Sequence, residues 1–141
     1  MTTILYVKKL DTDAIIPTKG SAGAAGYDLY ALEDTVLPVM KTTKVRTGIA
    51  VSIPEHCYGR IAPRSSLGAK GIIVHAGVVD SDYRGEIIVL LQSTEQEYCI
   101  KKGERIAQLI LEKYEHESML FRATVLDITD RGDRGFGSTG K

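Results

Sequence analysis

Near its middle the chain reads Ile72-Ile73-Val74-His75-Ala76-Gly77-Val78-Val79-Asp80-Ser81-Asp82-Tyr83-Arg84-Gly85-Glu86-Ile87-Ile88-Val89-Leu90-Leu91. Two apolar runs, 72–74 and 87–91, flank a central break that is rich in glycine, aspartate and serine. The runs are rich in β-branched residues, which favour strands, whereas the residues of the break favour turns. The stretch therefore predicts a β-hairpin, and similar segments lie on either side of it.

The break of this hairpin carries side chains suited to binding a planar ligand. Gly77 and Gly85 would let such a ligand approach the bare backbone, and Tyr83 offers a ring to stack on. Asp80 could orient a water molecule. Asp80 and Asp82 are explained equally well as turn residues that bond their own backbone, so the break by itself leaves both interpretations open.

The rest of the pattern is typical of an all-β domain. Short alternating or β-branched segments are separated by turn signals roughly every 8–12 residues, which favours a sandwich or barrel. Helical periodicity is weak: 112–122 is the best candidate, and 65–70 could form a single turn. The expected strands outside the hairpin are 3–8, 26–30, 35–39, 44–53, 58–62, 97–101 and 105–114.

The end of the chain has a different composition. Residues 127–141 are rich in glycine and charge and contain one aromatic residue, Phe136. Such a segment cannot bury enough apolar surface to order itself. We therefore expect a β-barrel domain over residues 1–126 and a flexible, glycine-rich C-terminal arm over 127–141 that closes over a ligand or a neighbouring subunit.

Composition and charge limit the class of protein. A chain of 141 residues fits one domain, and a hydrophobic content of 43% allows it a core. Lysine plus arginine and aspartate plus glutamate each number 18. Because there is no basic field to hold a polymer, a nucleic-acid partner is disfavoured, whereas a small anionic ligand needs only a local cluster.

Cysteine usage and hydropathy indicate the compartment. Cys57 and Cys99 are far apart in the sequence, so a disulfide scaffold or zinc site is disfavoured, and both are expected to be buried, reduced thiols. No stretch approaches the roughly 18 apolar residues of a membrane helix, and the N-terminus lacks a signal-peptide pattern. We expect an intracellular protein of the cytoplasm, the nucleus or a virus-infected cell, with no membrane partner.

Two segments are candidates for binding an anion. In the tail, 135–141 presents successive glycines whose N–H groups can form an anion nest, with hydroxyls at Ser138 and Thr139 and a permanent charge at Arg131. This segment matches Gly-x-Gly-x-x-Gly, but no helix follows it, so it is no dinucleotide fingerprint. At 63–67 an arginine and a serine precede a possible helical turn with free N–H groups. A disordered tail and an ordinary surface turn are the simpler explanations.

Five segments resemble, in order, the five motifs of the homotrimeric dUTP pyrophosphatases (dUTPases). Together they span most of the chain. Ser66 and Arg134 stand where that family usually or often has glycine, and Ser66 would cost about 1 kcal/mol if its position required a positive φ. The five segments are Ala25–Tyr30, Gly59–Ser65, Gly77–Glu86, Gly103–Ile110 and Arg131–Gly140.

This resemblance implies a fold, an assembly and a reaction. The fold would be a jelly-roll-like, distorted β-barrel, assembled as a homotrimer that exchanges its C-terminal arm between subunits. The reaction would be the hydrolysis of dUTP to dUMP and pyrophosphate, with Asp80 directing a water molecule at the α-phosphorus. Asp28 would help to hold Mg²⁺ through bound waters, while the substrate phosphates would hold most of the ion. Such an activity limits uracil incorporation into DNA and supplies dUMP for dTMP synthesis.

The resemblance also assigns the other site residues. The backbone at Gly77 and Val79 would recognise the uracil edge, Tyr83 would pack on the deoxyribose, and Phe136 would cover the base. The residues expected to contact the triphosphate are Arg64, Ser65, Ser66, Gln108, Arg131, Gly137, Ser138 and Thr139.

Two other classes of function remain open. The dCTP deaminases share the implied fold and resemble the hairpin, so a deaminase-like or bifunctional enzyme is one alternative. A non-catalytic trimeric module that binds a nucleotide or a protein partner is the other. The expected signature of that module is the loss of Asp80, Arg131 or Phe136, and all three are present.

Overall fold

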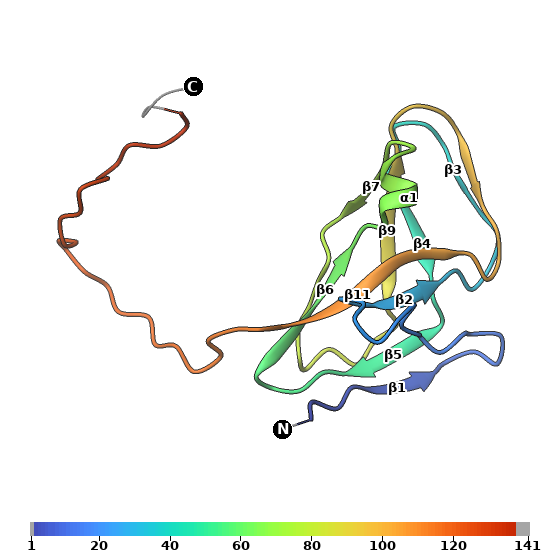
Figure 1. Ribbon diagram of the computed structural model, residues 1–141, viewed down its shortest axis with the longest axis horizontal. Coiled ribbons are helices and arrows are strands. Elements are labelled where there is room, and N and C mark those ends of the chain that lie inside the picture. The colour runs from blue at the N-terminus through green and yellow to red at the C-terminus, as the bar shows by residue number, and fades with distance from the viewer. Residues whose placement is uncertain (1, 138–141) are drawn as a thin grey trace.

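The computed structural model describes residues 2–137, and over this range the regular structure is almost entirely β (Figure 1). The predicted all-β class is therefore confirmed, and the single helical turn of the described residues falls inside the predicted 65–70. The elements are β1 (Tyr6–Lys9), β2 (Tyr27–Tyr30), β3 (Thr35–Leu37), β4 (Thr43–Arg46), β5 (Ile49–Ser52), β6 (Cys57–Ala62), α1 (Ser65–Gly68), β7 (Ile72–His75), β8 (Val78–Val79), β9 (Ile88–Ser93), β10 (Tyr98–Ile100) and β11 (Arg105–Lys113).

Two antiparallel sheets and two strand pairs make up the barrel. The larger sheet has the strand order β2-β11-β6-β8 and the smaller one β4-β9-β7, while β1 pairs with β5 and β10 with β3. One hydrophobic cluster contains inward-facing side chains of both sheets, including Leu29 and Leu109 from the larger and Val45, Val89 and Leu91 from the smaller. All five are fully buried, so the core lies between the sheets.

The hairpin predicted at 72–91 is present, but its break is longer and better ordered than a tight turn. β7 and β9 pair antiparallel, from Ile72 opposite Ser93 to His75 opposite Leu90. Between them the chain crosses to the larger sheet, where β8 pairs with β6 and Val79 lies opposite Gly59. One continuous stretch of sequence therefore joins the edges of both sheets.

The strand predicted at 44–53 is wrong in one respect, because the structure divides it into β4 and β5. The division falls at Gly48, whose φ of +72° suits glycine. A Cβ on Gly48 would lie 3.0 Å from side-chain atoms of both Ala14 and Leu32, so the bend is tightly packed. At this bend the chain leaves β9, the partner of β4, and joins β1, the partner of β5.

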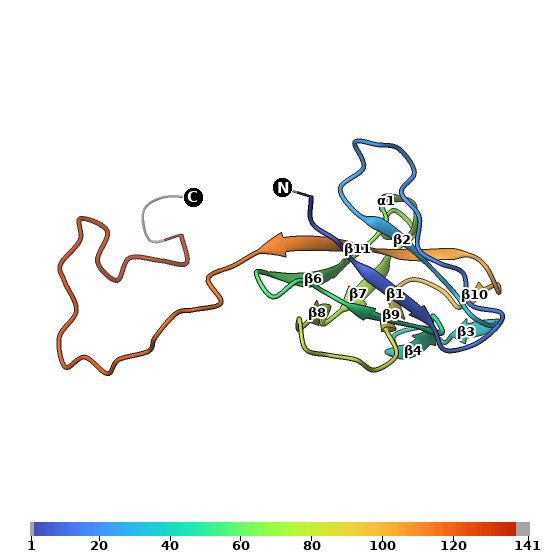
Figure 2. The ribbon, with the colours of Figure 1, turned by 90° about the horizontal axis from the view of Figure 1, so that it is seen from below.

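The helix considered at 112–122 is also wrong. β11 continues through Lys113, which lies opposite Cys57 in the register with β6, because these residues complete an antiparallel ladder. Beyond it the chain extends away from the barrel, as Figures 1 and 2 show. Every residue from 113 to 134 is exposed, so this segment has no core of its own against which a helix could pack.

The two cysteines differ in burial. Cys57 is buried at the start of β6, as expected, but Cys99 is exposed, so that part of the prediction is wrong. Cys99 is the middle residue of the short strand β10, and the fully buried Ile100 beside it takes the inward position. Successive side chains of a strand face opposite sides, which places Cys99 outward.

Candidate active site

A pocket opens between the loop at 76–87 and the strands beside it. The loop supplies most of its wall, β6 contributes Ile61, and β9 contributes Ile88 and Leu90. Backbone and apolar groups dominate this wall, with few polar side chains among them. The lining residues are Ile61, His75, Ala76, Gly77, Val78, Val79, Asp80, Tyr83, Glu86, Ile87, Ile88 and Leu90.

Gly77 lines this pocket at a point where the chain packs so closely against β6 that no side chain can fit. Its φ is +115°, and a Cβ would lie 2.7 Å from the carbonyl oxygen of Ile61. The Gly77 carbonyl accepts a hydrogen bond of 2.7 Å from the Ile61 N–H, which fixes the peptide against β6. Val79 turns its side chain into the core and is 7% exposed. The residues at 77–79 thus border the pocket, and the contact of their main chain with a planar ligand stays a prediction.

Tyr83 lies at the mouth of the pocket in a fixed orientation. Its hydroxyl donates to the carbonyl oxygen of Glu86 at 2.8 Å, and its backbone N–H donates to the Asp80 carbonyl at 3.1 Å. The ring covers Gly85, where any Cβ would collide with the phenol. Gly85 thus makes room for the tyrosine ring. This packing does not indicate the predicted role of Gly85, which was to admit a ligand.

The carboxylate of Asp80 is exposed at the pocket wall. Neither Asp80 nor Asp82 makes a side-chain hydrogen bond to the backbone of its own turn within residues 2–137; the turn bond instead uses the Asp80 carbonyl. The interpretation of these aspartates as turn residues acting through their side chains is therefore disfavoured. Asp80 is left accessible to a water molecule and a ligand.

A second group of candidate residues gathers on the larger sheet. Asp28 of β2 lies opposite Gln108 of β11, and Gln108 lies opposite Ala62 at the end of β6. The Gln108 amide donates to the Pro63 carbonyl at 3.2 Å, and the Arg64 guanidinium donates to the Arg105 carbonyl at 3.0 Å. Adjacent strands thus bring Asp28, Gln108 and the start of α1 together.

The residues around α1 and β2 have ordinary geometry. Ser65 and Ser66 begin α1, directly after the extended Arg64. Ser66 is not among the described residues with positive φ, so the replacement of glycine introduces no backbone strain there. The side chain of Asp28 is 17% exposed, and one of its oxygens lies 3.8 Å from an Arg105 nitrogen. Asp28 is accordingly paired and held in place.

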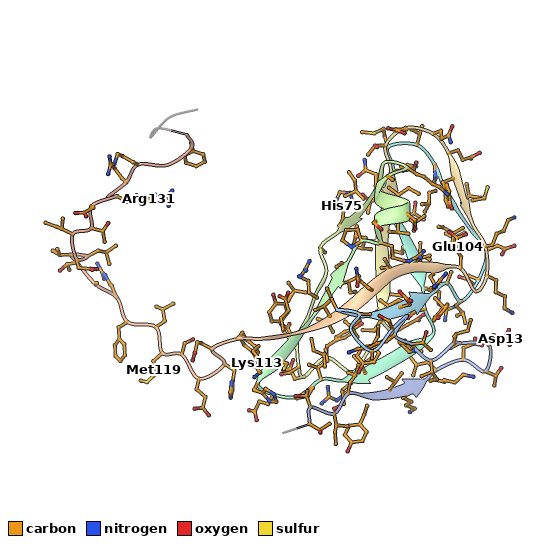
Figure 3. All side chains as sticks on the ribbon, viewed as in Figure 1. Asp13, His75, Glu104, Lys113, Met119 and Arg131 are labelled. Carbon is orange, nitrogen blue, oxygen red and sulfur yellow. The ribbon has the colours of Figure 1, made fainter. Side chains whose placement is uncertain are left out.

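Asp28 and the loop pocket do not meet within one chain. In the order β2-β11-β6-β8, the loop pocket borders β8 at one edge and Asp28 lies on β2 at the other. Three strand spacings of about 4.8 Å separate those edges. Arg131 lies far out on the extended segment, well away from His75 at the pocket wall (Figure 3). Phe136 and Gly137 belong to the same exposed segment, and Ser138 and Thr139 lie outside the described residues.

Fold and site together define a barrel-type β protein. It has a pocket lined by the 76–87 loop, a polar cluster around Asp28 and Gln108, and a C-terminal segment that extends away from the barrel. The sequence model of the dUTPase family matches residues 12–140. The chain belongs to this family.

Named relatives agree over nearly the whole chain. The deoxyuridine 5'-triphosphate nucleotidohydrolase of Paramecium bursaria Chlorella virus 1 is 54% identical over 140 residues, which cover 96% of this chain and 97% of that protein. The protein of the same name from Saccharomyces cerevisiae is 48% identical over 139 residues, covering 97% and 95%. The mitochondrial one from Homo sapiens is 49% identical over 139 residues, covering 97% of this chain and 55% of that protein.

Solved structures agree in fold. The dUTPase of Staphylococcus bacteriophage 80alpha with dUpNHpp superposes with a TM-score of 0.90 at 27% identity, covering 99% of this chain and all of that one. A mutant dUTPase from phage phi11 of S. aureus, described with a structural Mg(II) ion, gives a TM-score of 0.81 at 22% identity and covers 89% of this chain. The predicted jelly-roll-like β-barrel is confirmed.

Proposed function

We infer that the protein hydrolyses dUTP to dUMP and pyrophosphate, which limits uracil incorporation into DNA and supplies dUMP for dTMP synthesis. The observation that carries this inference is the dUTPase family match over residues 12–140 on a fold with a main-chain-lined pocket. The deaminase and non-catalytic alternatives are not favoured, since the named relatives are dUTP nucleotidohydrolases.

Main-chain groups of the 76–87 loop would recognise the base. The uracil edge offers a donor and acceptor pattern that backbone groups at 77–79 can pair with, and cytosine reverses part of that pattern. A mismatch would leave buried polar groups unpaired, which discriminates strongly. Tyr83, fixed over Gly85, would pack against the deoxyribose and exclude a 2′-hydroxyl.

Asp80 would act on the attacking water. The loop presents two carboxylates at the pocket wall, Asp80 and Glu86, and that of Glu86 is already bonded to Gly48 and Arg46. A carboxylate is a weak base, so most of its contribution would come from holding the water in line with the α-phosphorus.

The triphosphate would lie against donors from several elements. Arg64, Ser65 and Ser66 surround the start of α1, and Gln108 is one strand away. Fixed donors of this kind stabilise the charge that develops on phosphate oxygens. The arm would add Arg131, Gly137, Ser138 and Thr139.

Magnesium is the metal that this donor set fits. Residues 2–137 contain no group of three or more His, Cys, Asp or Glu side chains that could hold an ion by themselves. Mg²⁺ retains waters and relies on substrate phosphates, so the single carboxylate of Asp28 suffices to hold its hydration shell. When bound, the ion neutralises phosphate charge.

The active form would be a homotrimer whose arm, 127–141, crosses to a neighbour. Asp28 and the loop pocket lie at opposite edges of one sheet, and the exposed segment that carries the last motif lies apart from both. The segment after β11 also leaves large apolar side chains exposed, which a second copy of the chain would cover. These side chains are Met119, Leu120, Phe121, Val125, Leu126 and Ile128.

An intracellular location suits this activity. The relatives include a viral and a mitochondrial protein, so no single compartment is favoured. Within residues 2–137 we find no helix of the length and apolarity needed to cross a bilayer.

Pyrophosphate release from dUTP, dTTP, dCTP and UTP, each with and without Mg²⁺, tests this function. We expect rapid release from dUTP with Mg²⁺ and little from the other nucleotides. Ammonia from dCTP would instead indicate a deaminase, and nucleotide binding without any turnover would indicate a non-catalytic module.

A further inference from the structure

Glu86 stands at the point where the 76–87 loop rejoins the barrel, and its carboxylate is tied to a distant part of the chain. One oxygen accepts a hydrogen bond of 2.9 Å from the Gly48 N–H. The same carboxylate accepts from the Arg46 side-chain nitrogen Nε at 3.2 and 3.3 Å. The Glu86 side chain is 19% exposed, so these bonds are partly shielded from water.

The backbone partner of Glu86 lies at a closely packed and well-bonded point of the barrel. Gly48 forms the packed bend between β4 and β5. Next to it, Ile87 donates its N–H to the Ile49 carbonyl at 2.8 Å, and the buried Thr47 hydroxyl donates to the Ile87 carbonyl at 2.6 Å. The returning end of the loop is thus fixed to this bend by both backbone and side-chain bonds.

On its other side, Glu86 holds Tyr83. The Glu86 carbonyl oxygen is the acceptor of the Tyr83 hydroxyl, and the ring rests on Gly85. The direction of the Tyr83 ring therefore depends on the peptide between Glu86 and Ile87. The Ile87 N–H of that peptide donates to Ile49, and the carboxylate of Glu86 ties the same residue to Gly48.

We propose that Glu86 is a positioning residue that sets the preference for deoxyribose over ribose by fixing Tyr83. This inference rests on the proposed function, in which Tyr83 packs against the sugar. Without the Glu86 carboxylate, only the Ile87 N–H still holds this peptide, so the Glu86 carbonyl can rotate and the ring can tilt outward, which makes room for a 2′-hydroxyl. The effect therefore falls on selectivity between sugars, because the base-binding peptides at 77–79 are held separately by β6.

The test compares kcat/KM for dUTP and UTP in wild type and four variants. Glu86→Ala removes the carboxylate, and Glu86→Asp keeps its charge but shortens its reach to Gly48. Glu86→Gln keeps an oxygen that can accept from Gly48. Glu33→Ala is the matched control, because Glu33 pairs with the same Arg46, at 4.0 Å, without contacting the loop.

We expect Glu86→Ala and Glu86→Asp to lower the dUTP/UTP ratio by about tenfold or more, chiefly through a higher kcat/KM for UTP. Glu86→Gln and Glu33→Ala should stay within about threefold of wild type. If Glu86→Ala does not fold, Glu86→Asp decides the matter.

An unchanged ratio in the Glu86→Asp variant would overturn the proposal. The Tyr83→Phe variant distinguishes failure of the Glu86 proposal from failure of the proposed function. If that variant loses selectivity while the Glu86 variants do not, the role of Tyr83 stands and that of Glu86 falls. If wild type does not hydrolyse dUTP at all, the proposed function itself is wrong.

Discussion

At the scale of single residues, the proposed chemistry depends on Asp80, whose exposed carboxylate makes no side-chain bond to its own turn within the described residues. We expect Asp80→Asn to bind nucleotide normally but to lose about a hundredfold or more in kcat, because an amide cannot accept a proton from the attacking water. Steady-state kinetics together with calorimetric binding of a non-hydrolysable dUTP analogue measure both quantities. A kcat close to wild type would remove Asp80 from the mechanism.

Gly77 is the residue whose main chain we propose to contact the base. Gly77→Ala should destabilise the protein by about 2 kcal/mol or more and weaken dUTP binding, because its φ is +115° and the new Cβ would meet the Ile61 carbonyl. Urea denaturation measures the first effect. Gly68→Ala, where nothing lies within 4 Å of the added Cβ, is the control and should be nearly neutral. Equal stability of both variants would contradict this packing.

Residue identity predicted these roles unevenly. The sequence predicted an accessible backbone at both Gly77 and Gly85 from their lack of a Cβ. Gly77 has a φ of +115°, which suits glycine, and its contact with a ligand stays a prediction. The packing at Gly85 could not be predicted, since it comes from the ring of Tyr83, two positions before it, folded back over the turn. Glu86 was missed altogether: its partner Gly48 is 38 residues away, and no local pattern connects them.

At the scale of elements, the β6–β11 ladder ends in a charged cluster. The Tyr58 hydroxyl and the Arg60 guanidinium both donate to Glu112, and these bonds lower the pKa of the Glu112 carboxyl below its usual 4.5. A lowered folded-state pKa means that the stabilisation is present above pH 4.5 and is lost as pH falls through the lower value.

This cluster yields a prediction about acid sensitivity. Glu112→Gln should lower Tm at neutral pH, and the difference from wild type should shrink as the pH is lowered below the usual glutamate range. Thermal denaturation followed by circular dichroism between neutral and acidic pH checks it. A difference that stays constant, or grows, at low pH would show that the carboxylate charge is not what stabilises the ladder.

Most strands could be predicted because alternation and β-branched apolar runs are local signals. β9 was expected from the apolar run at 87–91, and in the structure its burial alternates residue by residue. The division at Gly48 could not, since apolar residues alternate on both sides of it and the bend is set by packing against Ala14 and Leu32. The crossing of the 76–87 loop to β6 depends likewise on a contact distant in sequence.

At the scale of the whole molecule, the extended C-terminal segment is the feature whose role the structure of a single chain does not explain. Removing residues 131–141 should leave a folded trimer that has lost roughly a hundredfold in kcat/KM, because the cover over the base and the charge at the phosphates are gone. Sedimentation and dUTP kinetics check the two parts. Full activity in the truncated protein would refute the role of the arm.

The all-β class could be predicted from strand and turn patterns, and the jelly-roll-like barrel from motif resemblance. The relation between the two groups of site residues could not be predicted from sequence alone. Asp28 lies in the first of the five family motifs and the 76–87 loop carries the third, yet the strand order places them at opposite edges of a sheet.

Mixing two inactive variants tests most directly the claim that each active site is shared between chains. Full-length Asp80→Asn supplies an arm, and the chain truncated after residue 130 supplies Asp80. When equal amounts are refolded together, about half of the chains carry Asp80 and the other half carry an arm. Random assembly then gives both parts to about a quarter of the sites, so we predict roughly a quarter of the wild-type rate of dUTP hydrolysis. A mixture no more active than either variant alone would contradict the shared site.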